Sequence, residues 1–233
     1  MGYVAGSTGR VHVAGNSSLS ASHYIYVGRL GSGEMTIDGG HVTSMSTTYF
    51  GFSGSSGNSA VLNLNGGKLT TRSLTVAGSP NAVFNWNGGT LECSTYSYAE
   101  GNMIPANANL QVNVLAGGAV YNAVARDDEV INHALSGVGS LTKTGAKPLT
   151  VSGAVDLAGG FIVEEGTLTL SNLTSTECKK ISVADGATLD LNGAEVTVDE
   201  YRLAGVKQRG GTYTAHNGTI HVKASGGVMA IIR

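Results

Sequence analysis

The chain has 233 residues, among them 35 glycines and only 3 prolines, with 41 % apolar residues, 13 % charged residues and a formal net charge of −2. Disorder normally requires low hydrophobicity with high net charge, and collagen requires glycine at every third position, so both are excluded. The scattered lysines and arginines form no basic patch for nucleic acid, and no apolar run approaches the roughly 18 residues of a membrane helix.

From the N-terminus onward, a motif recurs in which two alternating apolar residues precede a glycine corner and a further apolar residue. It reads VHVAGNSSL from Val11, MTIDGGHV from Met35, LNLNGGKL from Leu62, FNWNGGTL from Phe84 and VNVLAGGAV from Val112. The Gly-Gly pairs begin at residues 39, 66, 88 and 117, with spacings of 27, 22 and 29 residues. Such variable periods are typical of a solenoid whose connecting loops differ in length.

A second strand follows each motif and also ends at glycine. The examples are YIYVGRLGSG from Tyr24, TTYFGFSGSSG from Thr47 and SLTVAGSPN from Ser73. Glycine suits a corner because it adopts positive φ at no steric cost. Each rung of about 22 to 29 residues is therefore expected to hold at least two strands.

Side chains alternate between the two faces of a strand, and the motif separates apolar from polar residues on that basis. The inward positions are Met35, Ile37, Leu62, Leu64, Phe84, Trp86, Val112 and Val114. The outward positions are Thr36, Asn63, Asn85 and Asn113. Equivalent residues of a parallel stack lie about 4.8 Å apart, so the asparagines can form a hydrogen-bonded ladder. We therefore predict an all-β fold, a right-handed parallel β-helix (β-solenoid) of roughly nine rungs with a C-terminal cap.

An antiparallel β-sandwich is the alternative fold. Asn65-Gly66 and Asn87-Gly88 also resemble the two-residue turns of β-hairpins. The recurrence of asparagine at one register favours the solenoid.

Two polar stretches interrupt the repeat. Residues 96–109, which include Pro105, are expected to form a long loop that leaves the stack, and residues 126–132 a second loop or a hinge. They divide the chain into an N-terminal stack of residues 1–125 and a C-terminal stack of residues 126–233, which together are expected to form one continuous solenoid. Residues 202–233, with Lys207, Arg209 and Lys223, are expected to cap the last rung against edge-to-edge pairing.

Cys93 and Cys178 are the only cysteines. A secreted protein permits a disulfide between them, and two small buried thiols are equally compatible with the sequence. Because stacking already makes a long solenoid rigid, we favour free thiols.

Residues 137–172 resemble a known repeat. They read GVGSLTKTGAKPLTVSGAVDLAGGFIVEEGTLTLSN and are similar to the autotransporter-associated β-strand repeat, also called the passenger-associated transport repeat. The matching positions are Gly139, Leu141, Lys143, Gly145, Leu149, Val151, Ser152, Gly153, Gly159, Gly160, Ile162, Val163, Gly166 and Leu168. The chain departs from the family at Lys147-Pro148, where Gly-Thr is usual. The resemblance implies an exported, passenger-type β-helical protein that is stalk-like or adhesive, and it implies no particular catalytic activity.

Paired carboxylates are the candidates for catalysis, because acid/base hydrolysis requires two carboxyl groups with separated pKa values. The candidates are Asp127, Asp128, Asp156, Glu164 and Glu165, with Asp156 and Glu164 expected on adjacent rungs. Solvated turn residues are the alternative interpretation, which we favour. No Gly-x-Ser-x-Gly elbow and no phosphate-binding glycine loop occurs in the sequence.

The sequence suggests neither a metal site nor a cofactor. The histidines are expected to face outward into solvent; they are His12, His23, His41, His133, His216 and His221. Asp38, beside the stacked asparagines, is a further candidate for holding a cation.

Three tyrosines are candidates for ligand binding. Tyr24 and Tyr26 share one face of their strand, and if that face is outward they begin an exposed stripe that Tyr49 continues. Exposed aromatic patches often mark interaction sites, and a ring face packs well on a sugar.

These observations predict an exported bacterial surface protein, secreted or at the cell surface, whose export signal has been removed. It would be a structural or adhesive module that binds extracellular glycans, glycoproteins or other proteins, without nucleic acid and without insertion in a membrane. The alternative is a secreted hydrolase of glycoproteins such as mucin, either aspartyl-protease-like or glycan-cleaving, that uses the paired carboxylates.

Overall fold

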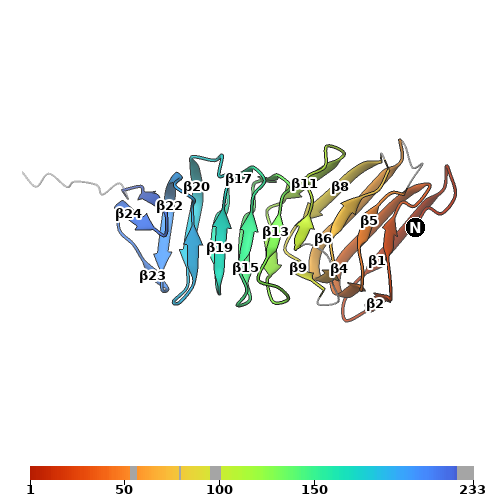
Figure 1. The fold of residues 1–233 in the computed structure, drawn as a ribbon, viewed down its shortest axis with the longest axis horizontal. Coiled ribbons are helices and arrows are strands. Elements are labelled where there is room, and N and C mark those ends of the chain that lie inside the picture. Colours follow the sequence, from red (N-terminus) through yellow and green to blue (C-terminus); the bar gives the residue numbers. More distant parts are fainter. Residues whose placement is uncertain (53–56, 79, 95–100, 225–233) are drawn as a thin grey trace, which may run out of the picture.

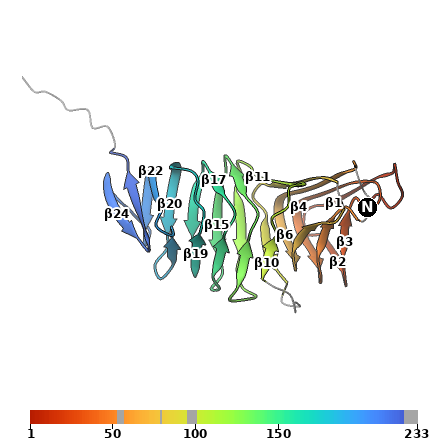
Figure 2. The same cartoon turned by 45° about the horizontal axis from the view of Figure 1, so that its top comes forward.

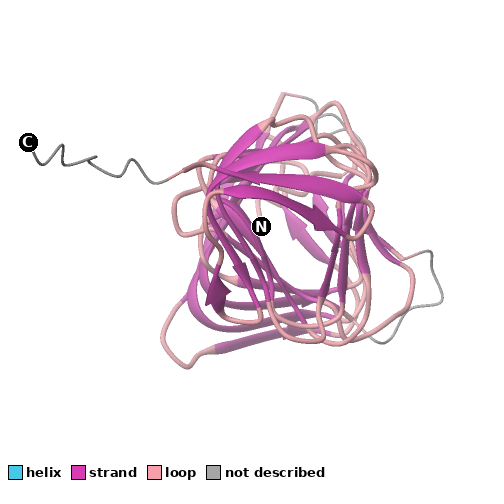
Figure 3. Cartoon of the chain, turned by 90° about the vertical axis from the view of Figure 1, so that its left-hand side faces the viewer, coloured by secondary structure: helices cyan, strands magenta, loops and turns pink. Residues whose placement is uncertain are grey.

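The computed structural model describes residues 1–52, 57–78, 80–94 and 101–224, which form strands and loops without any helix. The strands wind into about nine coils stacked along one axis, from the N-terminal coil at one end to the C-terminal strands at the other (Figure 1). Seen along that axis, the coils surround one common interior (Figure 3). The predicted parallel β-solenoid is confirmed.

Each coil contributes up to three strand segments, and equivalent segments pair from coil to coil. The first segments are β1 (Thr8–Val13), β4 (Ser32–Ser44), β6 (Ser59–Thr71), β8 (Asn81–Trp86), β11 (Leu110–Val114), β14 (Leu135–Gly137) and β17 (Val155–Leu157). The second segments are β2 (Ser18–Ala21), the later halves of β4 and β6, β9 (Thr90–Cys93), β12 (Ala119–Asn122), β15 (Ser140–Thr144), β18 (Gly160–Val163), β20 (Glu177–Val183) and β22 (Glu195–Leu203).

The third segments form two smaller sheets. One contains β3 (Ile25–Val27), β5 (Thr48–Phe50) and β7 (Leu74–Val76), and the other contains β10 (Asn102–Ile104), β13 (Glu129–Ile131), β16 (Leu149–Val151), β19 (Thr167–Leu170) and β21 (Thr188–Asp190). Figure 2 shows the same stack turned, with β3 near its N-terminal end.

The direction of pairing decides between the two predicted folds. Within the described residues, successive coils pair in parallel, as β4 does with β6 and β6 with β8. In the described part of the chain, antiparallel pairs occur only at the C-terminal end, where β23 (Val206–Lys207) pairs with β22 and β24 (Gly211–Ala215) pairs with β25 (Gly218–Val222). The antiparallel sandwich is therefore excluded, and the antiparallel strands end the stack as a cap. Residues 225–233 of the predicted cap lie outside the described part of the chain.

The Gly-Gly corners let neighbouring coils approach closely. β4 and β6 continue through these corners from the first segment into the second. Gly40 and Gly67 have φ of +70° and +62°, in the left-handed region that favours glycine. A Cβ on Gly40 would lie 2.1 Å from the Ser17 carbonyl oxygen, and one on Gly67 would lie 2.4 Å from that of Gly40. The repeated glycine pair is thus required by contact between corners.

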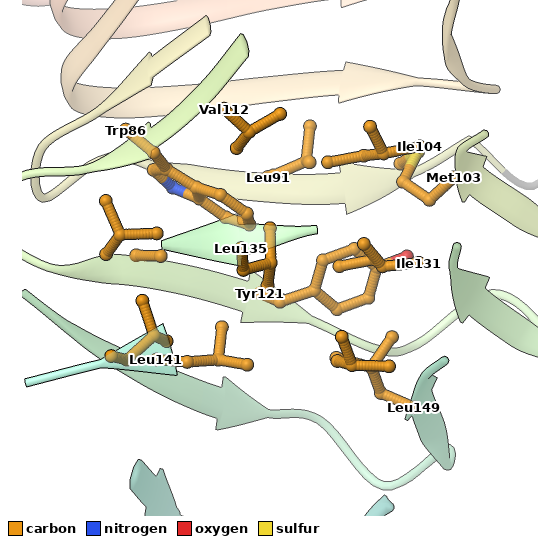
Figure 4. Packing of buried hydrophobic residues seen from close by; sticks show 14 of the residues in the cluster. Trp86, Leu91, Met103, Ile104, Val112, Tyr121, Ile131, Leu135, Leu141 and Leu149 are labelled. Atoms are coloured by element: carbon orange, nitrogen blue, oxygen red, sulfur yellow. The ribbon is translucent and has the colours of Figure 1, made fainter. Parts of the chain in front are cut away.

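The inward positions form columns of apolar side chains. Met35, Leu62, Phe84 and Val112 occupy equivalent positions of successive coils and are at most 3 % exposed. Trp86 lies in the neighbouring column, and its indole N–H donates to the Gly89 carbonyl at 2.7 Å. Further along, Leu91, Tyr121, Leu141 and Leu149 continue the core (Figure 4). Full burial of such side chains stabilises the fold by about 1.5–3 kcal/mol each.

The predicted asparagine ladder is present on the outer face. The Asn85 amide donates to Asn63 Oδ1 at 2.8 Å and accepts from the Asn113 amide at 2.9 Å. Asn63 in turn donates to Thr36 Oγ1 at 3.2 Å. The ladder therefore spans four coils.

Lys143 and Glu129 are buried charged residues inside the solenoid. Lys143 has no exposed surface, and its ammonium donates to the carbonyls of Thr144 at 3.2 Å, Glu165 at 2.8 Å and Gly145. Glu129 accepts from the Tyr121 hydroxyl at 2.6 Å and from the backbone N–H of Ala125 and Arg126. Each of the two side chains thus forms hydrogen bonds with groups at a turn of the backbone, and these bonds offset the cost of burying it.

Both predicted loops need correction. The described part of residues 96–109 contains β10, in which Met103 and Ile104 are fully buried. The stretch 126–132 contains β13, which pairs with β10 and β16. Each stretch contains a short strand with buried apolar side chains. Each stretch therefore belongs to the stack over part of its length. Residues 96–100 lie outside the described part of the chain.

Both cysteines are buried free thiols, as we favoured from the sequence. Among the described residues no helix is long and apolar enough to span a membrane.

Candidate ligand-binding surface

The tyrosines singled out in the sequence lie on the outer face of the sheet β3–β5–β7. Ile25, Val27 and Phe50 point into the core, so the alternating residues Tyr26 and Tyr49 point outward. Tyr26 pairs with Tyr49 in register, on adjacent coils. The condition attached to the predicted stripe, an outward face, is met.

The rings of this face lie against one another. Tyr26 and Tyr49 are stacked, with ring centroids 5.3 Å apart and an angle of 16° between the rings. The Tyr24 ring lies 5.5 Å from that of Tyr49 and is held tilted against it, and the Phe52 ring meets Tyr26 edge-on at 5.4 Å. Tyr24 remains 48 % exposed. We call Tyr24, Tyr26, Tyr49 and Phe52 the aromatic platform.

Arg29 lies beside the aromatic platform, and no pattern in the sequence pointed to it. Its guanidinium carbon lies 4.8 Å from the Phe52 ring centroid, 5.6 Å from that of Tyr26 and 4.8 Å from that of Tyr3. These are cation–π contacts. Arg29 follows β3 directly after Gly28, whose φ of +73° turns the chain. Its Nε–H is buried and has no hydrogen-bond partner.

No family model, curated protein or solved structure matches this chain.

The function must therefore be inferred from the residues of the chain itself. The carboxylates predicted as candidates for catalysis are the alternative to the aromatic platform. Asp127 accepts from the Lys147 ammonium at 2.8 Å, and Asp128 accepts from Arg126 Nε at 2.7 Å. The hydrogen bonds from Arg126 hold the pKa of Asp128 below its ordinary value, whereas a general acid requires a raised pKa. The two neighbouring aspartates thus bind different basic groups.

Asp156, Glu164 and Glu165 lie at separate places around one coil. Asp156 is the middle residue of β17, opposite Ser136 of β14. Glu164 follows β18 and donates its backbone N–H to the Lys143 carbonyl at 2.9 Å. Glu165 contributes its carbonyl to the buried Lys143 ammonium. Asp156 and Glu164 are thus on the same coil, separated by the rest of β17 and all of β18, and not on adjacent rungs as expected.

A polar ladder that the sequence did not reveal crosses the second segments. Glu92 of β9 accepts from Lys68 of β6 at 3.2 Å and from the Asn122 amide of β12 at 2.6 Å. Thr70 joins Glu92 to His41 of β4, with 2.9 Å between Thr70 Oγ1 and His41 Nε2. Burial, followed by the charge of Lys68, lowers the pKa of His41. Period-2 alternation could have shown these residues facing outward, but only the register brings them into contact.

The histidines do not behave alike. His12 lies outside and contacts the Asp38 carboxylate at 2.6 Å, while Asp38 also accepts from Asn65 at 2.7 Å. His133 is 8 % exposed, with its ring nitrogens bonded to the carbonyls of Ala134 and Asn107. The expectation of a solvated side chain is therefore wrong for His133, because backbone carbonyls replace water around its ring. Among the described residues no group of three or more histidines, cysteines or acidic residues is placed to hold a metal.

A depression of about 570 Å³ lies beside the C-terminal cap. Two of its lining residues, Lys207 and Lys223, are paired with Glu200 at 3.4 Å and with Asp199 at 3.0 Å. These lysines are thus already bound to carboxylates of the chain itself.

Proposed function

We propose that this chain is a module of an exported bacterial surface protein and that it binds glycans, free or on glycoproteins, through the aromatic platform. The supporting observation is the group of tyrosines on the outer face of two adjacent coils. Tyr26 and Tyr49 are partly buried and stacked, and Tyr24 lies tilted beside them with 48 % of its surface exposed. Tyrosine combines a flat apolar face with a polar hydroxyl, and it loses little conformational entropy when it binds because it is already rigid. A stack fixed on parallel strands is more rigid still.

The architecture supports the surface role. A solenoid of about nine coils is an extended rod, and such quasi-one-dimensional folds present long binding surfaces. The resemblance of residues 137–172 to the autotransporter-associated repeat supports export as a passenger-type protein, secreted or held at the cell surface. Lys143 lies within this stretch, and its ammonium donates hydrogen bonds to carbonyls of its own coil and of the next.

The test is binding to an array of bacterial and host glycans and to immobilised mucin-type glycoprotein. The variants are Tyr24→Ala and Tyr49→Ala, and the control is Tyr213→Ala, which removes a tyrosine at the other end of the stack. We expect the wild-type chain and the control to bind, and the platform variants to bind at least about ten-fold more weakly, as hot-spot aromatic residues do.

The proposal fails if the wild-type chain binds no glycan or glycoprotein, or if both platform variants bind as the wild-type chain does. Thermal unfolding of each variant separates loss of the ligand from loss of the fold.

A further inference from the structure

We infer that the aromatic platform recognises acidic saccharides, whose carboxylate or sulfate group binds to Arg29. This inference rests on the proposed function and adds the chemical class of the ligand. It depends on the position of Arg29 next to the stacked rings and on the groups that its guanidinium leaves without partners.

The charge of Arg29 is not neutralised by the described part of the chain. Arg10, Lys68 and Lys147 each lie within 3.2 Å of a carboxylate oxygen, which is the usual arrangement on this molecule. Arg29 has no such ion pair among the described residues, and its Nε–H has no hydrogen-bond acceptor. A cation that the fold holds in place without a counter-ion favours an anionic ligand.

The surrounding rings orient the guanidinium for this role. Tyr3 and Phe52 each lie 4.8 Å from its carbon, and their contacts restrict the side chain. The Nε–H is buried, so a ligand in solvent would meet the guanidinium along the edge formed by its two terminal Nη groups, which make no hydrogen bond to the described residues. That edge matches the geometry of a carboxylate or a sulfate, which arginine binds through two parallel N–H···O bonds.

The platform places a sugar-binding face next to that edge. The Tyr26 ring lies 6.0 Å from the Tyr24 ring and 5.6 Å from the Arg29 guanidinium carbon. Tyr24 offers the exposed ring, and the partly buried Tyr26 ring lies between it and Arg29. A short oligosaccharide bound on Tyr24 would therefore extend past Tyr26 toward Arg29. A neutral sugar would use only the rings, whereas an acidic sugar would use the rings and the cation.

The experiment compares matched pairs of oligosaccharides that differ only in charge. Oligogalacturonate is compared with the neutral oligogalactose of the same length and linkage, and 6-sulfated galactose oligosaccharides form the second acidic arm; binding is followed by calorimetry. We expect the wild-type chain to bind at least one acidic member about ten-fold more tightly than its neutral partner, and added salt to reduce this preference.

Variants of Arg29 test the assignment to that residue. We expect Arg29→Gln to abolish the preference for acidic over neutral oligosaccharides, and Arg29→Lys to retain part of that preference because the charge remains but the paired N–H edge does not. If Arg29→Gln does not fold, the inference is tested by comparing the preference for acidic over neutral oligosaccharides in the wild-type chain with that in Arg29→Lys.

Equal affinity for both members of every pair, or an undiminished preference in Arg29→Gln, would overturn the inference. Binding of the neutral sugars would in that case still support the proposed function. Absence of binding to all members of all pairs would overturn the inference, and the glycan array described above would then decide the proposed function separately.

Discussion

At the scale of single residues, the least expected feature is a buried lysine that has no carboxylate partner within ion-pair distance among the described residues. Lys143 lies between Tyr121 and Val163 in an inward column, where an apolar side chain would normally stand. Its ammonium is fully buried but binds three carbonyl oxygens. Burial still lowers its pKa, since the charged form loses water. The lysine thus exchanges hydration for hydrogen bonds to the turns of two coils.

Replacement of Lys143 tests this role. Lys143→Met keeps the length of the side chain but leaves the carbonyls without a donor, so we expect the free energy of unfolding to fall by about 2–5 kcal/mol in chemical denaturation. The control Lys147→Met removes only the exposed pair with Asp127 and should cost less than about 1 kcal/mol. Equal stability of Lys143→Met and the wild-type chain would show that the carbonyls find other partners.

At the scale of strands, equivalent outward residues bind one another along the stack. Asn85 occupies the middle of such a ladder, and Thr36 occupies its end with a single bond to Asn63. Because the asparagines stand on strands that pair in register, each bond ties one coil to the next.

The Asn85→Ala variant removes two of these bonds. We expect it to lower the free energy of unfolding by about 1–3 kcal/mol, and Thr36→Ala to lower it by about 1 kcal/mol. Denaturant titration of both variants gives the difference. If Thr36→Ala cost as much as Asn85→Ala, the ladder would not be the source of the effect.

The sequence predicted those features that depend on local alternation and on the repeat. Inward Phe84 and Trp86, outward Asn85 and the Gly-Gly corners all follow from period 2 and from equivalence between coils. Tyr26 and Tyr49 could be assigned to one face, but whether it was the outer face depended on the burial of Ile25 and Phe50.

What the sequence could not predict depends on contacts between distant residues. Arg29 is held by Tyr3 and Phe52, and Tyr3 lies outside the repeat, before its first copy at Val11. Glu129 stands in a polar run with two aspartates, which normally indicates a solvated loop, yet its bonds to Tyr121 and the backbone allow burial. The strand that contains Met103 is only three residues long, too short for periodicity to detect.

At the scale of the whole molecule, one interior runs through all coils, and ionisable groups inside it couple stability to pH. Burial raises the pKa of Cys93 and of Cys178 to about 12 from 9.0, and burial next to Glu129 raises that of Tyr121. Above pH 9 the unfolded chain therefore loses protons that the folded chain keeps, which lowers the free energy of unfolding as pH rises. Lys143 acts in the opposite direction, because its folded pKa is lowered.

Burial also raises the pKa of Tyr201. Because four buried groups thus oppose Lys143, we expect stability to decline between about pH 9 and pH 12. Denaturant titrations across this range measure the slope. A variant with both cysteines changed to alanine should show a shallower decline, since only Tyr121 and Tyr201 then remain of the four. A decline of the same steepness in that variant would refute the assignment to the thiols.

The claim on which the fold, the ladder and the aromatic platform all depend is that successive coils run parallel and in register. It is tested most directly by electron paramagnetic resonance of doubly spin-labelled chains in which both native cysteines are alanine. One chain carries labels at Ser59 and Asn81, which pair β6 with β8, and the other at Lys68 and Thr90, which pair β6 with β9. The two pairs thus join the first and second segments of the same two neighbouring coils. Parallel coils about 4.8 Å apart predict the same strong dipolar broadening in both chains, whereas broadening in only one of them would mean that the strands diverge or run in opposite directions.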